Sequence, residues 1–379
     1  MLSDSIRAIY TTNLGVKREE TVLVFTDLIS EKELIDAKIQ CRRERLRDIA
    51  LLTAEIGKSF AKKIIYHEYP STMSHGTEPP EGLWRLAFGE KAVKELIKSD
   101  LLPGLLAKKI SDDGIKKAEA VIDNHRNSCV DAVIALSNYS TSHTRFRDFL
   151  TSVCKSRYAS MPLFEASMFE GAMDVNWKDL AKRTTSVASA VAKADMIEIR
   201  TANGTHISLS KAGRKALADT GILTKPGSFG NLPAGEVYIA PLEGTANGEL
   251  VLDWAPMREL KSPVRLTVKS GLVVNVEGDE PYVEILSGRL NERKENANIA
   301  ELGIGTNDKA KRPDNILESE KILGTIHIAL GDNSSFGGKV QTPFHQDFVF
   351  FRPTITLIEK SGAKTVLMKD GKLKEISRP

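Results

Sequence analysis

The hydrophobic pattern of this chain changes near its middle, and that change most constrains how it can fold. In the first half, short apolar runs alternate with helical stripes. The run from Asp131 to Leu136 is apolar at nearly every position, as in strands buried on both faces of a parallel sheet. The segment from Glu31 to Ile56 spaces its apolar residues mostly by three and four, which predicts a helix. This strand and helix alternation predicts an α/β domain over residues 1–194, doubly wound around a largely parallel sheet.

From residue 195 onward, apolar and polar residues alternate with a period of two. The segments Met196–Arg200 and His206–Ser210 flank Asn203-Gly204, which predicts a β-hairpin. Further turns and alternating runs follow, with few helical patterns among them. We therefore expect an α+β, mainly antiparallel domain over residues 195–379. Its helices are expected chiefly at Glu280 to Lys294 and Asn315 to Leu323.

Composition excludes several classes of protein. The 379 residues include 53 Lys and Arg against 50 Asp and Glu, a net charge of +3. A nucleic-acid binder needs a clustered basic excess, so we expect no nucleic-acid partner. The longest apolar runs fall well short of the roughly 20 residues that a membrane-spanning helix needs, so we expect no membrane association. The first residues lack a secretory signal pattern, and we expect a cytoplasmic protein.

The second half contains two histidines with metal-ligand character. His345 and Asp347 are two residues apart at the start of an apolar strand, so their side chains are expected on the same side. An imidazole beside a carboxylate suits a divalent metal, although a surface strand with a solvated Asp would look the same. His327 lies at the centre of the apolar run Thr325 to Gly331. A hydrogen-bonded core histidine is the alternative there.

Two glutamates complete the set of candidate ligands. Glu236 and Glu301 both lie among apolar or small residues. A desolvated carboxylate is costly unless it is paired or binds a cation, whereas an edge strand would turn it toward water. Together with His327, His345 and Asp347 they provide two imidazoles and three carboxylates. That set is enough for one or two divalent metals.

The candidate ligands lie in four phrases between about residues 220 and 350. They are Asn231-Leu-Pro-Ala-Gly-Glu-Val-Tyr-Ile-Ala-Pro241, Ala300-Glu-Leu-Gly-Ile-Gly-Thr-Asn307, Thr325-Ile-His-Ile-Ala-Leu-Gly331 and Pro343-Phe-His-Gln-Asp347. In content and order, these phrases resemble the aminopeptidase T and aminopeptidase S family of metallopeptidases.

The resemblance implies a dimeric cytoplasmic exopeptidase with two divalent metal ions, zinc, cobalt or manganese. It implies that Glu236, Glu301, His327, His345 and Asp347 are the metal ligands, with Glu301 or Asp347 bridging the metals. This sequence departs from the family pattern in two places. The segment Asp332 to Gly338 has no tyrosine where the family has a tyrosine ligand, and the general-base glutamate has only Glu318 or Glu320 as nearby counterparts.

The family has iron-dependent relatives that cleave dihydroxypyridine rings with dioxygen. This chain resembles them in two phrases, Glu320-Lys321…Gly324-Thr325-x-His327-x-Ala329-x-Gly331 and His345-x-Asp347. His327, His345 and Asp347 would then form a facial triad for one Fe(II), without Glu236 or Glu301. A metal-bearing scaffold without catalytic activity is a third interpretation.

From these observations the main prediction is a homodimeric, metal-dependent aminopeptidase that acts on short peptides. Two metals would activate a water molecule, and Glu320 would carry its proton to the leaving amine. The mononuclear Fe(II) dioxygenase is the alternative.

Overall fold

The computed structural model of the chain describes residues 2–375, so Met1 and residues 376–379 of the predicted domains lie outside it. The chain forms two compact units. The first comprises Met1–Asp174 and Gly221–Pro233, and the second Val175–Thr220 and Ala234–Pro379. This division differs from the expected boundary at residues 194 and 195. Helix α8 (Trp177–Ala192) belongs to the second unit because it packs on that unit's strands β7 (Leu217–Asp219) and β9 (Glu236–Ile239).

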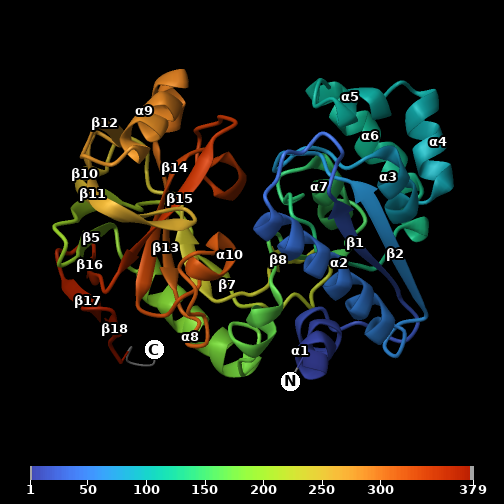
Figure 1. The fold of residues 1–379 in the computed structure, drawn as a ribbon, viewed down its shortest axis with the longest axis horizontal. Coiled ribbons are helices and arrows are strands. Elements are labelled where there is room, and N and C mark those ends of the chain that lie inside the picture. The colour runs from blue at the N-terminus through green and yellow to red at the C-terminus, as the bar shows by residue number, and fades with distance from the viewer. Residues whose placement is uncertain (1, 376–379) are drawn as a thin grey trace. The chain divides into compact units, whose positions relative to one another are not determined.

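The first unit is built on a five-stranded parallel sheet in the order β2-β1-β3-β4-β8. Figure 1 labels its strands β1, β2 and β8. Helix α2 packs on β1 and β2. Leu23 and Phe25 of β1 point into a core shared with helices α3, α4, α6 and α7, which includes Trp84 and Phe146. The strands are β1 (Thr21–Leu28), β2 (Lys63–Pro70), β3 (Ala132–Ala135), β4 (Arg157–Ser160) and β8 (Phe229–Asn231). The helices are α1 (Leu2–Ala8), α2 (Ala37–Gly57), α3 (Glu81–Phe88), α4 (Glu90–Lys98), α5 (Leu102–Leu106), α6 (Asp112–Asn124) and α7 (Arg145–Ser152).

The second unit contains two antiparallel sheets around one apolar core. The larger sheet has the order β12-β11-β10-β6-β5-β16-β17-β18, and the smaller β15-β14-β13-β9-β7. The larger sheet comprises β5 (Met196–Arg200), β6 (His206–Ser210), β10 (Asn247–Ala255), β11 (Arg258–Lys269), β12 (Leu272–Glu277), β16 (Thr354–Ile358), β17 (Lys364–Lys369) and β18 (Lys372–Leu373). The smaller comprises β7 (Leu217–Asp219), β9 (Glu236–Ile239), β13 (Ile299–Gly305), β14 (Thr325–Gly331) and β15 (His345–Phe351). Helices α9 (Tyr282–Glu292) and α10 (Ile316–Ser319) complete the unit.

The predicted fold class is confirmed: an α/β part with a parallel sheet and a mainly antiparallel part. The hairpin at Asn203-Gly204 forms as predicted: Arg200 of β5 pairs with His206 of β6 across the turn. The helix expected over Asn315 to Leu323 is shorter than predicted. It ends at Ser319, because Ile322 forms a bridge with Asn307 instead of another helical turn.

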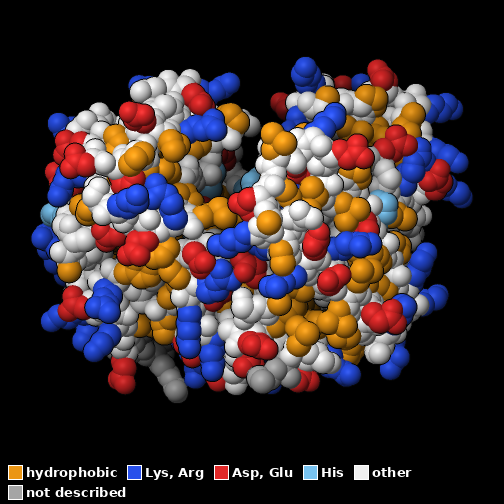
Figure 2. Space-filling view, in the orientation of Figure 1, with side chains coloured by type: hydrophobic (Ala, Val, Ile, Leu, Met, Phe, Trp, Pro, Cys, Tyr) orange, Lys and Arg blue, Asp and Glu red, His pale blue; other side chains and the backbone are white. Residues whose placement is uncertain are grey.

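The surface and the helices agree with the composition. Figure 2 shows Lys and Arg side chains interspersed with Asp and Glu over the visible face, as expected for a net charge of +3. Among residues 2–375, no helix is both long and apolar enough to cross a membrane.

The core of the second unit provides a stability test. Ile328 is fully buried in it, so Ile328→Ala should lower the free energy of unfolding by about 2–5 kcal/mol through lost contacts and a cavity. Val366 is 42% exposed, so Val366→Ala should change the free energy of unfolding by no more than about 0.5 kcal/mol. Urea unfolding followed by circular dichroism measures both. Equal effects of the two substitutions would contradict this account of the core.

Candidate metal centre

The smaller sheet of the second unit brings the predicted ligands onto one face. Across its strands, Glu301 and Asp347 both pair with Ala329, Gly303 pairs with His327, and Gly305 pairs with Glu236. Directly paired residues share a face of an antiparallel sheet, and His345 joins them two residues before Asp347. The other face is apolar and lies in the core; it includes Val237, Leu302, Ile304, Ile328 and Phe348.

Two glycines of β13 leave room for this arrangement. A β-carbon on Gly303 would lie 1.9 Å from Cε1 of His327, so the imidazole ring occupies the space above that glycine. A β-carbon on Gly305 would lie 2.0 Å from the carbonyl oxygen of Ile322. The phrase Gly303-Ile-Gly305 therefore lets both the imidazole and the segment after α10 approach the strand.

Glu236, Glu301 and His327 form one group of possible ligands, which we call the inner trio. Nε2 of His327 lies 3.3 Å from Oε1 of Glu301 and 3.5 Å from Oε2 of Glu236. One ligand atom from each residue lies within 4.8 Å of the others. Among the described residues, Oε2 of Glu236 and Nδ1 of His327 are buried without a hydrogen-bond partner. A buried polar atom without a partner requires an explanation, such as a water molecule or an ion, so the inner trio has the donor atoms for a cation.

Glu301, His345 and Asp347 form a second group, the outer trio, with the same 4.8 Å limit between ligand atoms. Nε2 of His345 lies 3.7 Å from Oε2 of Glu301 and 3.6 Å from Oδ2 of Asp347. Nδ1 of His345 lies 2.7 Å from the carbonyl oxygen of Asp332. A carbonyl can only accept, so Nδ1 donates and Nε2 of the neutral ring keeps a lone pair toward the two carboxylates. Metal-binding histidines are oriented in this way.

The two trios differ in access to solvent. The side chain of His345 is 29% exposed and that of Asp347 is 14% exposed. The side chains of His327 and Glu236 are only 1% and 8% exposed. Glu301 belongs to both trios. The five predicted ligands therefore lie in one cluster, and a substrate can reach only its outer side.

Sequence reasoning missed one charged residue of this cluster, Lys321. Its side chain is fully buried, and Nζ donates to Oε1 of Glu236 at 2.6 Å and to Oε2 of Glu320 at 2.9 Å. Lysine is almost never fully buried unless it is paired, so a lysine in a sequence is expected at the surface and not in a buried site. Its position between Glu320 and the apolar Ile322-Leu323 was the available signal.

The structure separates the two glutamates proposed as general base. Glu318 accepts hydrogen bonds from the backbone N–H groups of Lys311 and Arg312 and so holds a loop. Glu320 instead contacts Lys321 at the cluster. Burial raises the pKa of Glu320 to about 7, with Lys321 opposing the rise.

Charge interactions set the protonation of the histidines. Burial opposes protonation of His327, but hydrogen bonding to Glu301 and the charge of Glu236 outweigh it and raise the pKa to about 9. Burial likewise opposes protonation of His345, and Asp347 and Glu301 outweigh it, so its pKa is about 10. Without a metal, both rings therefore carry protons at neutral pH and balance the carboxylates.

An aromatic side chain stands beside the outer trio. The ring of Phe336 lies 6.1 Å from that of His345 and 5.9 Å from that of Tyr238, edge-on to both. Phe336 comes from the segment Asp332 to Gly338, where a tyrosine ligand would have been expected. That segment thus provides an apolar ring without a hydroxyl group.

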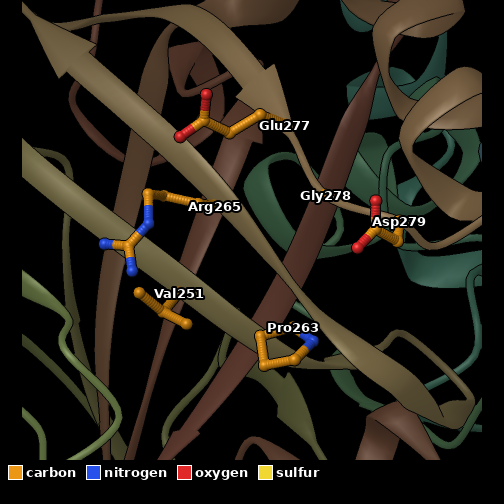
Figure 3. A pocket seen from close by; sticks show the side chains of 6 residues that line it. All are labelled: Val251, Pro263, Arg265, Glu277, Gly278 and Asp279. Carbon is orange, nitrogen blue, oxygen red and sulfur yellow. The ribbon is translucent and has the colours of Figure 1, made fainter.

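A separate surface hollow lies on the larger sheet (Figure 3). Its lining residues are Val251, Pro263, Arg265, Glu277, Gly278 and Asp279. None of them belongs to the inner or outer trio, so we assign the hollow no part in the metal centre.

Solved structures with the same fold support this architecture. The chain resembles the structure of 2,5-dihydroxypyridine dioxygenase from Pseudomonas putida KT2440, with a TM-score of 0.70 and 17% identity, covering 100% of this chain and 98% of that one. It also resembles wild-type AmpT from Thermus thermophilus, with a TM-score of 0.59 and 14% identity, covering 99% of each chain. At these identities the likeness is one of fold. Fold and site together define a two-unit protein with a histidine and carboxylate cluster suited to a metal.

Sequence comparison defines the family. A model of the 2,5-dihydroxypyridine 5,6-dioxygenase family matches residues 173–374, and the chain belongs to that family. It is 24% identical over 200 residues to the 2,5-dihydroxypyridine 5,6-dioxygenase of Pseudomonas putida strain KT2440. That match covers 48% of this chain and 57% of the relative, so the chain spans little more than half the relative's length.

The prediction of a metallo-aminopeptidase, a hydrolase and protease, is therefore wrong. The family and the curated relative are dioxygenases, which are oxidoreductases. The aminopeptidase resemblance holds at the level of the fold. The expected zinc, cobalt or manganese is not supported, whereas a cluster that can hold a metal is present. The short peptide substrates followed from the aminopeptidase assignment and fall with it. The homodimer, the cytoplasmic location and the absence of nucleic-acid partners stay predictions.

The space above Gly303 can be tested by substitution. Gly303→Ala should displace the His327 ring, lower the free energy of unfolding by about 1–3 kcal/mol and weaken Mn²⁺ binding by about 10-fold or more. Gly288 of α9 is the matched control, because a β-carbon there meets no atom within 4 Å. Gly288→Ala should be neutral or stabilise the protein by about 0.5–1 kcal/mol. Thermal unfolding and calorimetric titration with Mn²⁺ measure both effects.

Metal affinity should depend on pH. His345 binds a proton below its pKa of about 10 in the metal-free protein, and a metal ligand must be neutral. Mn²⁺ must therefore displace a proton, so its affinity should rise as the pH increases from neutrality toward about 10. Titration calorimetry in buffers of different ionisation enthalpy counts the released protons. An affinity that stays constant between pH 6.5 and 9 would contradict the assignment of His345 as a ligand.

Proposed function

We propose that this protein is a mononuclear Fe(II) dioxygenase that opens the ring of a dihydroxypyridine. The observation that carries the proposal is the outer trio of Glu301, His345 and Asp347. It is the accessible part of the cluster, and its histidine is oriented with the Nε2 lone pair toward both carboxylates. The family to which the chain belongs gives the substrate class.

The donor set fits iron. Non-haem Fe(II) oxygenases commonly use two histidines and one carboxylate and leave coordination positions open. The outer trio offers the same types of donor in the inverse ratio, one imidazole and two carboxylates. Of the facial triad expected from the sequence, His345 and Asp347 lie in the outer trio. Glu301 takes the third position there, and His327 lies behind it, 3.3 Å away, where it holds the carboxylate in place. When bound, iron would supply the redox chemistry by which dioxygen attacks an electron-rich ring.

Neighbouring side chains provide the remaining functions. Phe336 and Tyr238 give the outer side an aromatic wall, against which a planar pyridine ring can pack edge-to-face. Glu320 is the nearby carboxylate best placed to accept a proton from a ring hydroxyl group, since Lys321 fixes its position. Removal of that proton makes the ring richer in electrons and therefore more reactive toward dioxygen.

The proposal is tested with protein reconstituted anaerobically with Fe(II). Consumption of 2,5-dihydroxypyridine should match oxygen uptake one to one, with one iron bound per chain. Glu301→Gln should lose iron and activity together by about 100-fold or more, because a ligand carboxylate is removed. Glu236→Gln should keep its single iron, because Glu236 belongs only to the inner trio.

Glu277→Gln, on the larger sheet, is the control and should leave iron content and activity unchanged. Two metals per chain in the native protein, or iron without any ring cleavage, would exclude the proposed function. The second result would instead favour a metal-bearing scaffold.

A further inference from the structure

We infer that Lys321 is a tethered cation that stands in for a second metal ion beside Glu236 and thereby keeps the centre mononuclear. This inference rests on the proposed function and extends it. The inner trio has the geometry to hold a divalent ion. The cation that lies beside it, however, is the ammonium group of Lys321.

Four carboxylates gather at this site: Glu236, Glu301, Glu320 and Asp347. Lys321 is the lysine that contacts two of them, with Nζ at 2.6 Å from Glu236 and 2.9 Å from Glu320. Its side chain is completely buried, so water does not screen its charge. A buried cation with two carboxylate partners neutralises them as a bound metal ion would.

The two oxygens of Glu236 have different surroundings. Oε1 accepts the hydrogen bond from Lys321, while Oε2 faces His327 at 3.5 Å and has no hydrogen-bond partner among the described residues. A divalent ion in the inner trio would have to bind Oε2 of the same carboxylate that already holds the ammonium group. Like charges this close repel strongly in a buried site, because the effective dielectric constant there is low. Lys321 therefore disfavours a second ion without blocking the space itself.

Asn307 holds both members of this ion pair in place. The backbone N–H of Asn307 donates to the carbonyl of Lys321 at 2.8 Å, and the N–H of Leu323 donates to the carbonyl of Asn307 at 3.0 Å. The side-chain amide of Asn307 donates to the carbonyl of Ala234 at 2.9 Å, two residues before Glu236. One residue therefore fixes both chain segments that carry the ion pair. This fixed position distinguishes Lys321 from a flexible surface lysine.

The consequence is a centre with one exchangeable metal. A tethered ammonium group cannot dissociate, has no redox chemistry and offers no coordination position to substrate. Glu301, shared by both trios, is then left for the outer metal instead of bridging two ions. The same fold can thus present a single iron to dioxygen, although it carries enough ligands for two ions.

The test uses the full-length protein and Mn²⁺ as the only metal. Lys321→Met removes the charge but keeps a long side chain. Wild-type protein should bind one Mn²⁺ per chain, and K321M should bind two, with the second site tightened on the order of 100-fold or more. The two ions in K321M would share Glu301, so electron paramagnetic resonance should show an exchange-coupled pair that the wild type lacks. K321M/E236Q should return to one ion.

Lys364→Met, at an exposed position on β17, is the matched control and should still bind one ion. If K321M does not fold without metal, excess Mn²⁺ should restore the fold, because the ion replaces the lost cation. Failure of Mn²⁺ to do so overturns the inference. One ion in both wild type and folded K321M also overturns it while leaving the proposed function intact. Two ions or none in the wild type overturn both.

Discussion

The structure of the second unit depends on burying carboxylates beside an apolar core. Glu236 and Glu301 lie on strands whose other faces include Val237 and Leu302, deep between two sheets. Burying a carboxylate in such a place costs several kcal/mol unless a cation or hydrogen bonds compensate. The compensation here comes from Lys321 and from the two histidines. Each of these groups is therefore needed for stability as well as for chemistry.

This requirement is compatible with the fold that the chain shares with AmpT and with a 2,5-dihydroxypyridine dioxygenase. The glycines around Gly303 and the pairing of β13, β14 and β15 build a face that gathers acidic and imidazole side chains. Such a face attracts cations in general, and it specifies neither the number of cations that bind nor their identity. The difference depends on single side chains beside it. Lys321 supplies a fixed positive charge, and Phe336 supplies an aromatic ring in a segment without tyrosine.

Elements with a strong local pattern were predicted well. The strand at Thr325 to Gly331 and the hairpin at Asn203-Gly204 both form where their patterns indicate, because periodicity and turn residues act over a few residues. Elements whose ends depend on contacts with residues far along the chain were not predicted correctly. The helix after Asn315 ends early because Asn307 pairs with the chain beyond it. The short strand Phe229–Asn231 forms only because β4 offers it a partner edge.

The sequence by itself determined that one part has a parallel sheet with helices and the other a mainly antiparallel sheet, because the spacing of apolar residues indicates each. It also identified five candidate metal ligands, because few residue types bind metals. It could not decide which candidates act together. That depends on the register of the strands, which places Glu301 between His327 and His345. It also could not show that a lysine enters the cluster, because the segments carrying Glu236 and Lys321 are 85 residues apart. Only tertiary packing brings that ammonium group and that carboxylate together away from water, where their charges interact most strongly.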